Sequence, residues 1–143
     1  MEKNLRSEVR LRLERAFISL GSAKNSLDGA FYGDSISSAY YAMFHATKAL
    51  IILEGKDAKT HSGVIQIFNQ QFVQTGEIEK YVADKLRQAQ NARTLSDYEY
   101  EFIPTREKAG RALDEAKEFV QILTEHLKEH YKITPAFSNN SSK

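Results

Sequence analysis

The stretch from Ser35 to Leu53 constrains the fold most, because it carries three lines of side chains at helical spacing. The first line has almost no side-chain volume, the second is bulky and the third is polar. In that order, they are Ala39, Ala42, Ala46 and Ala49; Tyr40, Met43, Phe44, Leu50 and Ile51; and Ser38, Tyr41, His45 and Lys48. Lys48 is the one lysine, arginine or acid in the stretch, so we expect a mostly buried helix whose polar line needs partners or a ligand.

Apolar residues recur at spacings of three and four along most of the chain, which predicts about five helices. Their expected ranges are 4–27, 34–53, 60–75, 77–92 and 104–130. Asp34 or Ser35 is the expected cap of the second helix, and the polar, aromatic segment 93–102 is the least periodic. No segment alternates with a period of two, so we predict an all-α, antiparallel helical bundle with a four-helix up-and-down core.

The 143 residues fit one domain, which we place at residues 1–130, followed by a flexible C-terminal tail at 131–143 that is rich in Ser, Asn and Lys. The absence of cysteine excludes disulfides, thiolate metal sites and cysteine nucleophiles. No apolar run approaches the ~20 residues of a membrane span, and the N-terminus lacks a signal-peptide pattern, so we expect a cytoplasmic protein. A net charge of +1 argues against a large DNA-binding field but allows a local anion site.

Several sequence blocks, in order along residues 5–127, resemble the HEPN superfamily, specifically its small single-domain branch of uncharacterised bacterial and archaeal proteins. The blocks are Ser38–Ala46, Lys59–Val64, Phe72–Gly76, Ala92–Arg93 with Ser96–Tyr98, and Glu115–Val120. The resemblance implies a helical bundle that commonly forms a homodimer. It also implies association with a nucleotide, with RNA or with a nucleotidyltransferase partner.

Ribonucleases of this superfamily carry an Arg, then four to six residues, then a His, often followed two residues later by a Tyr. Arg93 matches the Arg, but Tyr98 stands where the His is expected, and Tyr100 takes the Tyr position. A phenol with a reference pKa of ~10 is a poor base at neutral pH, whereas an imidazole titrates there. The resemblance therefore implies a non-catalytic or differently catalytic member, and we expect no cofactor. In related toxin–antitoxin pairs the Tyr at the Tyr100 position can be a modification target for the partner nucleotidyltransferase.

Arg93, Asp97, Tyr98 and Tyr100 form the first candidate ligand site. Arg93 can hold a phosphate through two hydrogen bonds, and a tyrosine can stack on a base. The alternative is a structural Arg93–Asp97 pair, four residues apart, that fixes a helix end.

Tyr41, His45, Lys48 and His61 form the second candidate site. His45 could replace the missing imidazole or contact an anion with Lys48; alternatively, it is a core histidine hydrogen-bonded to a neighbour. His61 lies at a helix N-terminus, where Thr60 and Ser62 either line an anion site or simply cap the helix.

A metal site is not expected. His126 and His130 have a spacing that can bind one ion, but no other His or Cys lies near them in the sequence.

From these observations we predict a non-catalytic nucleotide- or RNA-binding or interaction module. Arg93, Tyr98 and Tyr100 would contact the ligand, supported by His45, Lys48 and His61. One alternative is a metal-independent ribonuclease toxin of a toxin–antitoxin system, in which His45 or His61 supplies the base beside Arg93. A second alternative is a structural dimer without a small ligand.

Overall fold

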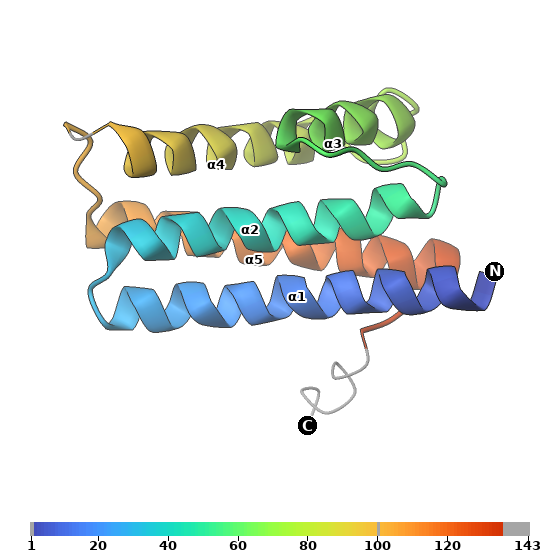
Figure 1. Ribbon diagram of the computed structural model, residues 1–143, viewed down its shortest axis with the longest axis horizontal. Coiled ribbons are helices and arrows are strands. Elements are labelled where there is room, and N and C mark those ends of the chain that lie inside the picture. Colours follow the sequence, from blue (N-terminus) through green and yellow to red (C-terminus); the bar gives the residue numbers. More distant parts are fainter. Residues whose placement is uncertain (1, 100, 136–143) are drawn as a thin grey trace.

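The computed structural model describes residues 2–99 and 101–135, and within them it contains helices and no strand (Figure 1). The all-α prediction is therefore confirmed. The elements, in chain order, are α1 (Glu2–Asp28), α2 (Tyr32–Ile52), α3 (His61–Phe68), the π-helix η1 (Asn69–Val73), α4 (Lys80–Tyr98) and α5 (Arg106–Tyr131).

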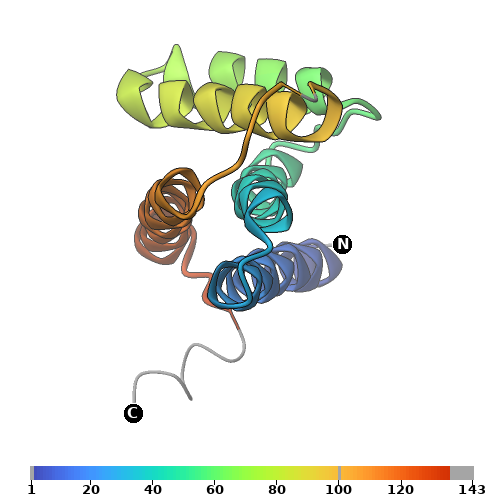
Figure 2. The ribbon, with the colours of Figure 1, turned by 90° about the vertical axis from the view of Figure 1, so that its left-hand side faces the viewer.

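The long helices α1, α2, α4 and α5 alternate in direction along the chain, which makes the predicted up-and-down bundle (Figure 1). Helix α2 contacts α1, α3, α4 and α5, so it is the centre of the fold. Figure 2 shows α1, α2 and α5 nearly end-on, with α3 and α4 crossing above them. Among the described helices, none combines the length and the apolar character that a membrane span needs.

The alanine row explains how α2 can pack against so many neighbours. Ala39, Ala42, Ala46 and Ala49 are each at most 1% exposed within the single chain, so the row serves packing inside the monomer. Small side chains let helix backbones approach closely, and the bulky residues beside the row fill the remaining core. Ser35 is also buried and donates a hydrogen bond from Oγ to the Ala23 carbonyl of α1 at 2.8 Å.

The beginning of α2 differs from the prediction. Phe31 is the N-cap and offers no side-chain hydrogen bond, so the expected cap at Asp34 or Ser35 is wrong. The helix begins earlier because the backbone N–H of Ser35 bonds to the Phe31 carbonyl while its hydroxyl serves α1.

The end of α4 also differs, because the helix continues through residues 93–98. Tertiary contacts with α2 stabilise this last part, and Gly33 allows the close approach. A Cβ atom at Gly33 would lie 3.1 Å from Ser96 Oγ.

The chain directly after α5 packs on the bundle. Arg6 donates hydrogen bonds to the carbonyls of Tyr131 (2.9 Å) and Lys132 (2.6 Å), and Ile133 is 1% exposed. Lys132 adopts a left-handed conformation with φ of 57°, which turns the chain back toward the core. Residues 136–143 lie outside the described residues, so the tail there stays a prediction.

Candidate functional site

Helices α2, α3 and α4 bring five of the predicted site residues together, and we call Tyr41, His45, Lys48, His61 and Arg93 the cationic cluster. Tyr41, His45 and Lys48 lie on successive turns of α2. His61 is the first residue of α3, and Arg93 lies near the end of α4. The segment that precedes α3 and the extension of α4 past residue 92 therefore complete the site.

Arg93 is held from two sides. Its Nη2 donates a hydrogen bond to Tyr41 Oη at 3.0 Å, and its guanidinium carbon lies 5.3 Å from the centre of the Tyr41 ring. Its Nε lies 2.9 Å from Asp97 Oδ2, an ion pair whose angle does not suit a hydrogen bond. Asp97 in turn accepts a hydrogen bond from Ser37 Oγ at 3.1 Å. The predicted Arg93–Asp97 pair is thus present and also ties α4 to α2.

Arg93 nevertheless keeps binding capacity. Its side chain is 22% exposed, and Nη1 makes no hydrogen bond with the described residues. Because Asp97 and Tyr41 fix the guanidinium, little side-chain entropy remains to be lost when a ligand binds.

His61 is fixed by three aromatic rings. Its Nδ1 lies 2.7 Å from the Tyr40 hydroxyl. Its ring stacks on Phe44, with centroids 4.1 Å apart, and meets Tyr41 edge-on at 5.7 Å. Thr60 caps α3 by accepting a hydrogen bond from the Gly63 N–H at 3.0 Å, so the capping role proposed for Thr60 is confirmed.

The tautomer of His61 follows from its partner. Burial, and secondarily the neighbouring Tyr41, raise the pKa of Tyr40 to about 12, while Arg93 opposes the shift. The phenol therefore keeps its proton, and because an imidazole nitrogen is the stronger acceptor, we assign Tyr40 as the donor to Nδ1. Burial first, then Arg93 and Lys48, lower the pKa of His61, which favours the neutral ring. In that state the proton of His61 is on Nε2, which can donate to a ligand.

His45 is the half-buried histidine of the cluster, and its buried Nδ1 has no hydrogen-bond partner among the described residues. The alternative of a core histidine bonded to a neighbour is therefore wrong for this atom. Burial is the main cause that lowers the pKa of His45 to about 4, and the charges of Arg12, Arg15 and Lys48 add to the effect.

Positive charge gathers at this site although the whole chain is nearly neutral. Arg12, Arg15, Lys48 and Arg93 are the cations that lower the histidine pKa values. Lys48 is partly neutralised by Asp57, whose carboxylate lies 3.1 Å from Nζ. Arg12 and Arg15 of α1 thus contribute to the field at a site on α2.

Three of the predicted site residues lie outside the cationic cluster, and of these Asp97 touches it through its ion pair with Arg93. Tyr98 is 70% exposed at the end of α4, and Tyr100 lies outside the described residues.

Two contributors were missed by the sequence prediction. Tyr40 lies on the bulky line of α2, and Ser37 lies on none of the three lines that the sequence shows. Helical spacing on α2 cannot show that the Tyr40 hydroxyl meets His61, because the loop before α3 sets that contact.

His126 of α5 joins α5 to the turn before α4. His126 Nε2 lies 2.6 Å from Glu77 Oε2, and Tyr131 Oη donates to the same oxygen at 3.3 Å. These contacts join the turn before α4 to α5. Within the described ranges, no group of three or more His, Asp or Glu side chains is arranged to hold a metal ion.

The fold and the cluster together define a helical-bundle protein with an arginine placed beside aromatic and imidazole rings. The model of the HEPN domain matches residues 9–127, and the chain belongs to this family. One relative, in Methanocaldococcus jannaschii, is named "Putative toxin MJ0605"; it is 35% identical over 129 residues, which are 90% of this chain and 96% of the relative.

Two further comparisons agree with the family assignment. A UPF0332 protein of Archaeoglobus fulgidus is 34% identical over 114 residues, covering 80% of this chain and 90% of the relative. The crystal structure of TT1696 from Thermus thermophilus matches with a TM-score of 0.72 at 22% identity, covering 84% of this chain and 98% of that one. This structural match supports the fold.

The lowered pKa of His45 predicts a loss of stability in acid. Below pH ~6.5 the unfolded chain binds a proton at this histidine, while the folded protein binds it only near pH 4. The free energy of unfolding should therefore fall as the pH drops from 6.5 to 4. In His45→Gln this decrease in the free energy of unfolding should be smaller by on the order of 1–2 kcal/mol. The measurement is urea unfolding at pH 7 and pH 4.5.

The control for this measurement is His130→Gln, which changes an exposed histidine at the end of α5. It should leave the pH dependence as in the wild type. Equal pH dependence of wild type and His45→Gln would contradict a buried, neutral His45.

Proposed function

We propose that this protein binds single-stranded RNA through a phosphate held at the cationic cluster. The observation that carries the proposal is the grouping of Arg12, Arg15, Lys48 and Arg93 around two histidines whose pKa values are lowered. Such a site favours an anion, and the Arg93 guanidinium and the His61 Nε2–H supply directional donors. A small local site of this kind fits a chain with a net charge of only +1.

Tyr98 extends this proposal to a base. Its ring is 70% exposed five residues after Arg93 on the same helix. Exposed aromatic rings beside a cationic groove are a common platform for bases of single strands. Arg93 would thus hold a phosphate while Tyr98 stacks on a neighbouring base.

Replacing Arg93 by Ala should weaken RNA binding at least tenfold, because it removes the central cation of the cluster. The measurement is fluorescence anisotropy with a labelled 12-nucleotide single-stranded RNA at several salt concentrations. Loss of a phosphate contact should also reduce the slope of log K against log salt concentration. Tyr98→Ala should weaken binding with little change in that slope.

The matched control is Arg87→Ala, which removes the same charge from an exposed position on the same helix. It should bind RNA nearly as the wild type does. If no RNA binds, or if both arginine variants lose affinity equally, the proposal is wrong, and a structural dimer without a small ligand becomes the better account.

A metal-independent ribonuclease is the second candidate, favoured by the neutral His61 that shares the cluster with Arg93. The relative from M. jannaschii carries a name that calls it a toxin, which is compatible with such an activity. As a base, His61 would need the other tautomer, in which Nδ1–H donates to Tyr40 and Nε2 accepts a proton from a ribose 2′-hydroxyl.

This candidate predicts cleavage of mixed RNA in excess chelator. His61→Gln should abolish the cleavage and His130→Gln should preserve it, as followed by gel electrophoresis. Intact RNA, or cleavage that survives His61→Gln and Arg93→Ala, would exclude the ribonuclease mechanism.

A homodimer, a nucleotidyltransferase partner and a cytoplasmic location stay expectations that come from the family and the composition.

A further inference from the structure

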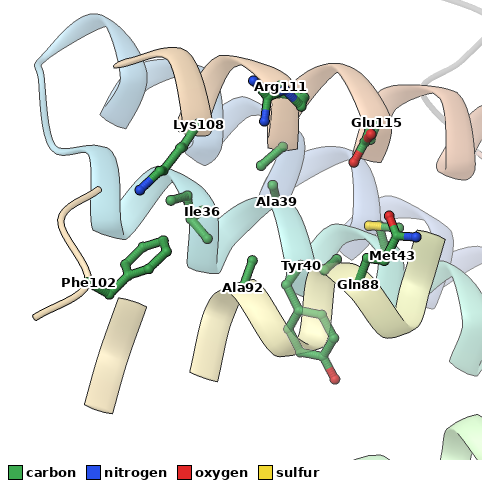
Figure 3. A pocket seen from close by; sticks show the side chains of 12 residues that line it. Ile36, Ala39, Tyr40, Met43, Gln88, Ala92, Phe102, Lys108, Arg111 and Glu115 are labelled. Carbon is green, nitrogen blue, oxygen red and sulfur yellow. The ribbon is translucent and has the colours of Figure 1, made fainter. Parts of the chain in front are cut away.

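A cavity of about 310 Å³ lies between α2, α4 and α5, and its floor is apolar (Figure 3). Ile36, Ala39 and Met43 of α2 face Ala92 of α4 there. Protein interiors are close-packed, and a space of this size is at the lower end of the range for small-molecule sites. An apolar cavity of this kind favours the apolar body of a ligand over water.

 The cavity shares no charged residue with the cationic cluster, although Tyr40 lines the cavity and its hydroxyl bonds to His61 of the cluster.

The mouth of the cavity is positively charged and lies along α5. Lys108, Arg111 and Glu115 follow one another at helical spacing there (Figure 3). Glu115 is already paired, since its Oε2 lies 3.1 Å from Lys85 Nζ. Lys108 is engaged as well: its Nζ donates to the Ile103 carbonyl at 3.2 Å and lies 4.4 Å from the centre of the Phe102 ring.

Arg111 is the uncommitted charge at this mouth. It makes no hydrogen bond or ion pair with the residues that the structure describes, and its side chain is exposed. A guanidinium presents two parallel donors that match the two oxygens of a carboxylate. An apolar floor below one free guanidinium is therefore complementary to a molecule with an apolar body and one carboxylate.

We propose that the cavity between α2, α4 and α5 binds a small aliphatic or aromatic monocarboxylic acid, with the carboxylate on Arg111 and the apolar body against Ala39, Met43 and Ala92. Phe102, braced by Lys108, closes one end of the site. The proposal does not depend on RNA binding, because it rests on different charged residues.

Octanoate tests this proposal, with octanamide as its neutral counterpart and octylammonium as its cationic one. The chain has two methionines, so labelling their methyl groups with ¹³C gives a Met43 signal inside the cavity. Octanoate should shift that signal in a saturable manner and bind at least fivefold more tightly than octanamide. Octylammonium should bind more weakly than either.

Arg111→Gln should remove the preference for octanoate over octanamide, while Arg106→Gln, a change of the same charge at an exposed position on α5, should keep it. Ala92→Leu fills the cavity and should abolish binding of both compounds, with circular dichroism confirming the fold.

Three results would overturn the proposal. The first is no saturable shift of Met43 with octanoate. The second is equal affinity for octanoate and octanamide, or a preference that survives Arg111→Gln. The third is a Met43 shift that depends on protein concentration without any added acid, since a second copy of the chain would then occupy the cavity.

Discussion

Close packing along the alanine row of α2 is the constraint on which the rest of the structure depends. Four buried alanines let this helix lie at the centre of the bundle, in contact with α1, α3, α4 and α5. Little of a central helix is exposed to solvent, so its polar side chains need hydrogen-bond partners from other helices. Ser35 meets a carbonyl of α1, Tyr40 meets His61, and Tyr41 meets Arg93.

The electrostatics of the site follow from this packing. Burial and nearby arginines favour the uncharged forms of His45 and His61, so the two rings add no positive charge of their own. The cations remain; Lys48 and Arg93 pair with Asp57 and Asp97 respectively, and the charge of Arg12 also acts on Asp57. A chain with almost no net charge can in this way build a local field that favours an anion.

The sequence was sufficient to predict the bundle, the burial of α2 and the pairing of Arg93 with Asp97, because these depend on helical spacing within one element. It also indicated that Tyr41, His45 and Lys48 share a line. It was not sufficient for contacts between elements. Tertiary packing overrides local capping and periodicity at three places. These are the start of α2 at Tyr32, the end of α4 at Tyr98 and the hydrogen bond between Tyr40 and His61.

The most direct measurement of the central claim is photochemical cross-linking to an RNA oligonucleotide that contains 4-thiouridine, followed by mass spectrometry of the linked peptides. If the cationic cluster holds the RNA, the cross-links should fall on peptides that contain residues 41–48, 59–62 or 93–98. Arg93→Ala should reduce them, and Arg87→Ala should not. Cross-links confined to the exposed face of α5, unchanged by Arg93→Ala, would contradict the account.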